Sequence, residues 1–129
     1  MKFEEMQVGV PYPEKKFVIT EESVKAYLAA VGDDTPLYAE QRLVAPSYAA
    51  VYTRWEELTG EPLEHGSIHV KQRFRYLRPI HWGETITLRG HVKEKINKHG
   101  LQLVVQLVEV LNEAGELAVT SEITLIPPA

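Results

Sequence analysis

The chain has 129 residues, of which 44% are hydrophobic and 25% are charged, and its formal net charge is -4. This composition is typical of a folded globular protein, and the length suits one domain over residues 1–129. The acidic charge argues against nucleic acid as a partner, because phosphate backbones are usually bound by basic surfaces. The sequence has no cysteine, which excludes disulfides, thiolate metal sites and a cysteine nucleophile.

Several other classes of protein lack their signatures in this sequence. The acidic start of the chain has no apolar run typical of a secretory signal, and no stretch approaches the ~20 apolar residues that cross a membrane. We therefore expect a cytoplasmic protein with no membrane association. The five histidines lack the spacing of metal ligands, and there is no glycine-rich phosphate loop, so we expect no metal and no cofactor.

The first predicted helix follows a short strand at the end of the turn-rich residues 7–19. Thr20 is a favoured N-cap residue, and apolar side chains recur at helical spacing from Val24 to Val31. Gly32 then provides the usual helix stop.

A second predicted helix begins at Pro46 and Ser47, because proline is tolerated in the first turn of a helix. Its apolar stripe is formed by Tyr48, Val51, Tyr52, Trp55 and Leu58. This spacing predicts one long buried helix that ends at Gly60.

Four strands are predicted in the second half, where the apolar period changes from 3.6 to 2. They cover residues 68–77, 84–97, 101–111 and 117–126, with turn residues between them. This order predicts an α+β fold in which an antiparallel sheet carries its helices on one face. Residues 101–111 are apolar on both faces, which indicates a central strand covered by a helix on one side and by a partner subunit on the other.

The segment after the first helix is a candidate for chemistry. Asp33 and Asp34 follow a helix C-terminus, whose dipole disfavours negative charge, and such local conflicts often mark functional sites. The same residues also suit an ordinary turn before Thr35 and Pro36, because aspartate is a common turn former. Spacing alone leaves both interpretations open.

Residues 32–38 resemble the G-D-x-N-P-x-H motif of the MaoC-like hydratases and dehydratases. Gly32, Asp33 and Pro36 agree with that motif, whereas Thr35 stands in place of its Asn and Tyr38 in place of its catalytic His. Residues 45–47 (A-P-S) and 69–84 (with Q-R-F-R-Y-L-R-P-I and G-E) are also similar to the N-terminal-type dehydratase domains of this superfamily. The resemblance implies a hot-dog fold, in which an antiparallel sheet wraps around a long central helix.

The resemblance also implies the candidate catalytic residues Asp33 and Tyr38. In active relatives the Asp and His together hold and deprotonate a water next to the thioester. A tyrosine has an ordinary pKa of about 10, so Tyr38 can donate a hydrogen bond but is a poor base near neutral pH. Asp33 could serve as the base if burial raised its pKa, or it could be a structural remnant.

The start of the second helix is the expected substrate site, with Pro46, Ser47 and Tyr48 as its residues. Free backbone N–H groups at a helix start favour a developing oxyanion, and the resemblance places the thioester carbonyl there. The alternative is that Ser47 only caps the helix.

Basic residues gather on one predicted strand and on its expected neighbour. Arg73 and Arg75 could bind the phosphates of coenzyme A or an acidic carrier protein, or they could belong to an ordinary solvated face. The full set is Lys71, Arg73, Arg75, Arg78, Lys93, Lys95 and Lys98.

Three functions follow from these residues. The first is the substrate-binding subunit of a hydroxyacyl-thioester dehydratase or enoyl-thioester hydratase, in a heterodimer with a catalytic hot-dog subunit that supplies the missing His. The second is a homodimeric enoyl-CoA hydratase that uses Asp33, with Tyr38 as hydrogen-bond donor. The third is an acyl-CoA binding or thioesterase-like protein, for which Glu56 and Glu57 are the helix-borne carboxylates. The ligand in each case is an acyl-CoA or acyl-carrier-protein thioester.

Overall fold

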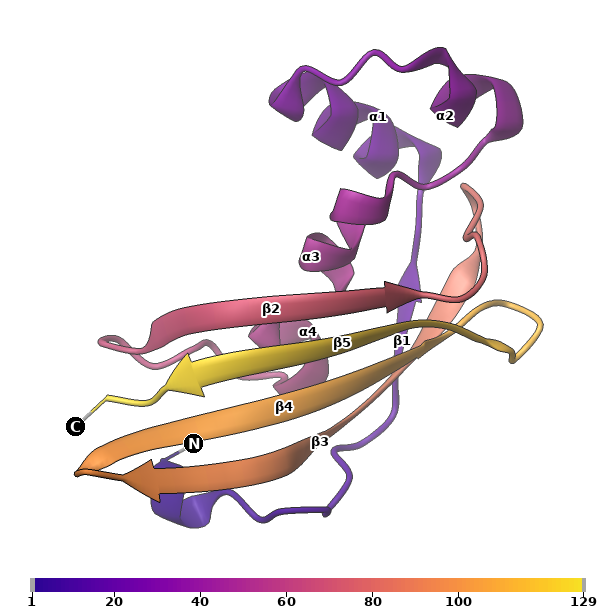
Figure 1. Ribbon diagram of the computed structural model, residues 1–129. Coiled ribbons are helices and arrows are strands. Elements are labelled where there is room, and N and C mark those ends of the chain that lie inside the picture. The colour runs from indigo at the N-terminus through magenta and orange to yellow at the C-terminus, as the bar shows by residue number, and fades with distance from the viewer. Residues whose placement is uncertain (1, 129) are drawn as a thin grey trace.

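The computed structural model describes residues 2–128 and consists of one five-stranded antiparallel sheet with helices against one face (Figure 1). The strands are β1 (Lys15–Val18), β2 (Ile68–Tyr76), β3 (Thr85–Lys98), β4 (Leu101–Leu111) and β5 (Leu117–Ile126), and the helices are α1 (Glu21–Val31), α2 (Pro36–Gln41), α3 (Ala49–Tyr52) and α4 (Trp55–Thr59), with short 3-10 helices η1 (Phe3–Glu5) and η2 (Pro46–Tyr48). The strand order is β1-β3-β4-β5-β2. In Figure 1, α1 and α2 form a layer that stands away from the strands.

The first helix is confirmed with both of its predicted ends. The Ser23 backbone N–H donates to the Thr20 hydroxyl at 3.1 Å, as expected of an N-cap. Gly32 adopts the left-handed conformation with φ 71°, which lets the chain turn away from the last helical residue, Val31.

The prediction that residues 101–111 form a central strand is also confirmed. β4 pairs with β3 on one side and with β5 on the other. Its inner side chains, among them Val104 and Val108, are fully buried against the helices. On the outer face Leu103, Val105 and Leu107 are half-buried, so this face keeps apolar surface in contact with solvent in the single chain.

The prediction of one long central helix is wrong, because the helix is interrupted after α3. The Thr53 hydroxyl donates to the Ala49 carbonyl at 2.6 Å and shares this acceptor with the Thr53 backbone N–H at 3.1 Å, an arrangement that often bends helices. Arg54 then adopts an extended conformation with φ -61° and ψ 151°, and it becomes the N-cap of α4. A further helix that was not predicted, α2, begins at Pro36.

Two glutamines near this break, the partly buried Gln72 and the buried Gln106, are held very differently. The Gln72 amide N–H₂ donates to the hydroxyls of Thr53 and Ser121, each at 3.1 Å. Gln106, on the inner face of β4, is 0% exposed, and neither end of its amide has a hydrogen-bonding partner among the described residues. An unpaired buried polar group costs about 1–3 kcal/mol.

Truncation of the core should destabilise the fold far more than the same change at the surface. Leu88 on β3 is 1% exposed, and we expect Leu88→Ala to lower the free energy of unfolding by about 2–5 kcal/mol, since it leaves a cavity. Leu101→Ala is the matched control, because Leu101 is 47% exposed and its loss should cost no more than about 0.5 kcal/mol. Urea denaturation measures both values, and equal losses would contradict the packing described here.

Candidate functional site

A cleft lies where α2, η2 and the end of β2 meet. It has a volume of about 470 Å³. We call it the Pro46 cleft, and its lining residues are Leu37, Tyr38, Leu43, Val44, Ala45, Pro46, Tyr52, Tyr76, Leu77, Arg78, Pro79, Ile80 and Val119. The predicted site residues Tyr38 and Pro46 therefore face one space.

Hydrogen bonds between distant segments fix the walls of the Pro46 cleft. The Tyr76 hydroxyl donates to the Pro46 carbonyl at 2.7 Å, which ties the end of β2 to η2. The Trp82 indole N–H donates to the Leu43 carbonyl at 2.7 Å, and the Val44 N–H donates to the Ile80 carbonyl at 2.9 Å. The segment between α2 and η2 is thus held against the connection from β2 to β3.

The Pro46 cleft is lined by apolar side chains and phenols, with one guanidinium, that of Arg78, which is paired with Glu116. None of its lining residues, all within the described part of the chain, is a carboxylate or an imidazole. Burial raises the pKa of Tyr52 far above its ordinary value, and burial also raises the pKa of Tyr76. These phenols stay protonated near neutral pH, so they cannot accept a proton from water, and the single O–H of Tyr76 is already donated to the Pro46 carbonyl.

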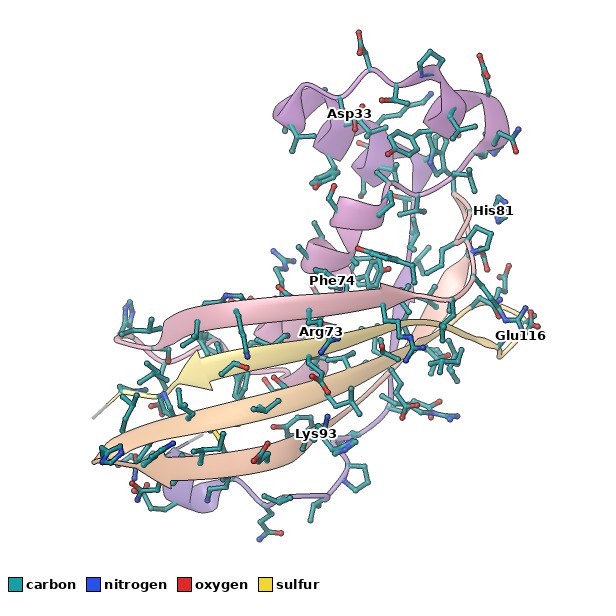
Figure 2. All side chains as sticks on the ribbon, in the orientation of Figure 1. Asp33, Arg73, Phe74, His81, Lys93 and Glu116 are labelled. Carbon is teal, nitrogen blue, oxygen red and sulfur yellow. The ribbon has the colours of Figure 1, made fainter. Side chains whose placement is uncertain are left out.

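Asp33 lies outside the Pro46 cleft and is partly exposed at the end of α1, away from the strands (Figure 2). Its carboxylate accepts hydrogen bonds from the Thr35 hydroxyl at 2.6 Å and from the Thr35 backbone N–H at 3.0 Å. These two bonds hold the pKa of Asp33 below its ordinary value, and the bond from the Thr35 hydroxyl has the larger effect. Asp33 therefore does not line the cleft that Tyr38 lines, and it is a weaker base than a free aspartate.

The start of the central helix offers less to a ligand than the sequence suggested. The N-cap residue is Ala45, so Ser47 does not cap the helix, and its hydroxyl instead accepts a hydrogen bond from Tyr27 at 2.8 Å. Tyr48 is 2% exposed, and its ring packs edge-on against the ring of Tyr27. The Tyr48 N–H donates to the Ala45 carbonyl at 2.9 Å, so this amide is not free to bind an oxyanion.

Arg73 and Arg75 lie on the opposite face of the sheet from the Pro46 cleft. Gln72 points inward to Thr53, so its neighbour Arg73 points outward, where it borders a shallow hollow with Arg75 and Glu122. Figure 2 shows Arg73 and Lys93 over the sheet face toward the viewer, while α4 passes behind the strands. Neither arginine lines the Pro46 cleft.

The prediction that the two strands with basic side chains are neighbours is wrong. β2 and β3 are separated by β5 and β4, because β3 pairs with β1 and β4 instead. Lys93 forms an ion pair with Glu122, and Lys95 donates to the Met6 carbonyl at 3.1 Å. Lys93, Arg73 and Lys71 all act on the Glu122 carboxylate and lower its pKa, so basic side chains of β2 and β3 still share one face and are partly neutralised there.

The two helix-borne carboxylates also lie outside the Pro46 cleft. Glu57 forms an ion pair with Arg54 at 2.8 Å, and Glu56 is exposed. Between residues 2 and 128, no three His, Cys, Asp or Glu side chains are grouped as a metal site requires. No helix in the same range is long and apolar enough to cross a membrane.

Sequence reasoning missed most of the residues that line the Pro46 cleft, including Leu43, Ile80 and Val119. Leu43 and Ile80 lie between the long regular elements, where no periodic pattern marks them, whereas Val119 lies within β5 and only the folded arrangement brings it to the cleft. It also missed Gln106, for which a signal was present. Gln106 is a polar residue at an inward position of a strand whose neighbours Val104 and Val108 are apolar.

Comparisons with known proteins agree with this architecture. Residues 6–121 match the model of the family described as FAS1-like, dehydratase domain region. A UPF0336 protein of Cutibacterium acnes is 31% identical over 96 residues, which cover 67% of each chain.

Two solved structures show the same fold. The (3R)-hydroxyacyl-ACP dehydratase complex HadBC of Mycobacterium tuberculosis has a TM-score of 0.74 at 23% identity, with 92% of this chain and 96% of that chain covered. The MaoC-like dehydratase of Rhodospirillum rubrum has a TM-score of 0.75 at 17% identity, with 100% and 98% covered. The chain therefore belongs to the family of FAS1-like dehydratase regions and has the hot-dog fold of the MaoC-like dehydratases.

Proposed function

We propose that this chain is the substrate-binding subunit of a (3R)-hydroxyacyl-thioester dehydratase and that a second hot-dog chain supplies the base. The reverse direction of the same reaction is the hydration of an enoyl thioester. The observation that carries the proposal is the composition of the Pro46 cleft, which has apolar walls and phenols but no carboxylate or imidazole in its lining. Addition or removal of water needs a group that accepts a proton near neutral pH. A cleft without such a group can hold an acyl thioester but needs help to transform it.

The phenols give the cleft a role in holding the substrate. Tyr38 stands at the motif position of the catalytic His and lines the cleft with Pro46. A protonated phenol can donate a hydrogen bond to a thioester carbonyl, while Leu37, Leu77 and Ile80 provide apolar contact for an acyl chain. Either coenzyme A or an acyl carrier protein could present the thioester.

The two other functions have less support. A homodimeric hydratase would need Asp33 as its base, but Asp33 lies outside the cleft with a lowered pKa. A thioesterase would need a carboxylate beside the thioester, and Glu57 is engaged with Arg54 instead.

The sheet offers a place for the second subunit. β2 is an edge strand of nine residues that pairs only with β5 among the described strands, so its other edge has unpaired backbone groups. The outer face of the same sheet carries the half-buried apolar side chains of β4, which are Leu103, Val105 and Leu107. A hot-dog partner that extends the sheet at β2 would satisfy these backbone groups. The similar HadBC structure is a dehydratase complex.

An activity assay tests the division of labour. The purified chain should bind crotonyl-CoA without hydrating it, and hydration should begin when a second hot-dog protein of the same genome with an intact G-D-x-N-P-x-H motif is added. Loss of the enoyl absorbance reports the reaction. Full hydration by this chain alone would defeat the proposal.

In the assembled pair, Asp33→Asn should leave the hydration rate unchanged. Loss of hydration in this variant would instead assign the base to Asp33.

A charge in the cleft should weaken binding of the acyl chain. Leu37 lines the Pro46 cleft and is 47% exposed, so Leu37→Glu should be tolerated by the fold while it places a carboxylate against the acyl chain. We expect the Kd for octanoyl-CoA, measured by calorimetry, to rise about tenfold.

Val31→Glu is the matched control for this measurement. Val31 is 55% exposed at the end of α1 and does not line the cleft, so the Kd should not change. Equal effects of the two substitutions would mean that the acyl chain binds elsewhere.

The pKa of Asp33 should depend on Thr35. Thr35→Val removes the hydroxyl that stabilises the carboxylate, so the pKa of Asp33 should rise toward its ordinary value, but only in part because the backbone N–H remains. The hydrogen bonds therefore favour the folded state above the ordinary aspartate pKa, and this contribution is lost as pH falls through the lowered pKa. Carboxyl carbon NMR over a pH titration measures the change, and Thr59→Val should leave Asp33 unaffected.

A further inference from the structure

A second cleft lies beneath the interruption between α3 and α4. It has a volume of about 260 Å³ and shares no lining residue with the Pro46 cleft. We call it the Gln106 cleft, and its lining residues are Ala50, Thr53, Arg54, Trp55, Glu56, Leu63, His69, Gln72, Gln106, Ile123 and Leu125. On β2, Gln72 of this cleft and Tyr76 of the Pro46 cleft are four residues apart, which is ~13 Å along the strand, and on the helix the two clefts are lined by the adjacent residues Thr53 and Tyr52.

The interruption of the helix creates the space. Thr53 bonds back to Ala49, and Arg54 then leaves the helical conformation, so α4 starts in a new direction. Trp55, Ile123 and Leu125 form a buried apolar floor with Gln106. Arg54, Glu56 and His69 are exposed, so the cleft reaches the protein surface along this side.

Gln106 is the group in this cleft that requires a partner. The Gln72 amide N–H₂ already donates hydrogen bonds to the hydroxyls of Thr53 and Ser121. The Gln106 amide has two N–H donors and one carbonyl acceptor, and none of them is bonded to a described residue. Buried polar groups in folded proteins are nearly always hydrogen-bonded, so an unpaired amide beside a cleft indicates that something else completes it.

The size of the cleft indicates a ligand larger than one water. A single water needs roughly 10–15 Å³ of such space, and small-molecule sites begin at roughly 300 Å³. The Gln106 cleft lies near the lower end of that second range. It can hold a group of several heavy atoms.

The charges around the Gln106 cleft select for a neutral group. Arg54 is already paired with Glu57, and Glu56 would repel an anion. The buried floor holds no charged side chain to compensate an ionised ligand, and an uncompensated charge is strongly disfavoured there.

We propose that the Gln106 cleft binds a neutral group that both donates and accepts hydrogen bonds, an alcohol or a carboxamide, with Gln106 as the residue that selects it. Such a group could be the distal end of an acyl thioester whose head lies in the Pro46 cleft, which rests on the proposed function. It could also belong to a free small molecule. Both sources would present the same hydrogen-bonding group, and experiments can distinguish the acyl thioester from the free molecule.

The first measurement compares 12-hydroxydodecanoyl-CoA with dodecanoyl-CoA by calorimetry. If the group is the end of an acyl chain, the wild type should bind the hydroxylated thioester about fivefold more tightly, which is the effect of one added hydrogen bond. Gln106→Met keeps the size of the side chain and removes the amide, so it should abolish this preference. Gln102→Met is the matched control on β4, outside the cleft lining, and should retain it.

The second measurement uses hexanamide as the free probe. The side-chain amide signal of Gln106 in the ¹H–¹⁵N NMR spectrum should shift when hexanamide binds. Without ligand, Gln106→Met should melt at a higher temperature than the wild type, because it removes an unpaired buried amide, and this result also establishes that the variant folds.

The outcomes separate this inference from the proposed function. A preference for the hydroxylated thioester assigns the group to the acyl chain, and a hexanamide shift without that preference assigns it to a free molecule. Equal binding of both thioesters with an unmoved Gln106 signal overturns the Gln106 cleft as a binding site and leaves thioester binding intact. If neither thioester binds, the proposed function fails, and the hexanamide shift alone decides this site.

Discussion

The structure depends on how the inner face of β4 is covered. Val104 and Val108 are fully buried there, and a single straight helix would cover only a narrow stripe of so wide a sheet. The chain instead uses two short helices, α3 and α4, that diverge at Thr53 and Arg54. This divergence buries Trp55 and Leu58 over the sheet and leaves a cleft on either side of α3. The positions of both candidate sites follow from the same interruption of the helix at Thr53 and Arg54.

The residues of the family motif are divided between two places in this chain. The Pro46 cleft presents phenols that stay protonated, so it can orient a carbonyl without reacting with it. Asp33, which the family motif places at the reaction, is instead bonded to Thr35 at the surface. The residue at position 35 thus matters as much as the one at position 38, since a threonine there holds the carboxylate in a turn. Under the proposed function, a partner chain supplies the proton acceptor.

The sequence predicted the regular elements well and the sites poorly, and the reason is physical. Strand period and local capping act within a few residues, so α1 with Thr20 and the central position of β4 were predictable. The apolar stripe from Tyr48 to Leu58 keeps its spacing through the interruption, so the pattern could not reveal it. The Pro46 cleft is built by contacts such as Trp82 with Leu43, whose partners are far apart in the chain. Such contacts depend on the folded arrangement and leave no local signature.

The two edges of the sheet differ in a way that limits how copies can join. β1 has four residues, two of them lysines, and residues 8–12 bond along β3 beyond it, at Gly9 to Val92 and at Tyr12 to Gly90. Short and charged edges resist further pairing. β2 is longer and open on one side. A sheet with one receptive edge can add one neighbour and then stops growing, so this asymmetry favours a closed pair and protects the protein from forming filaments.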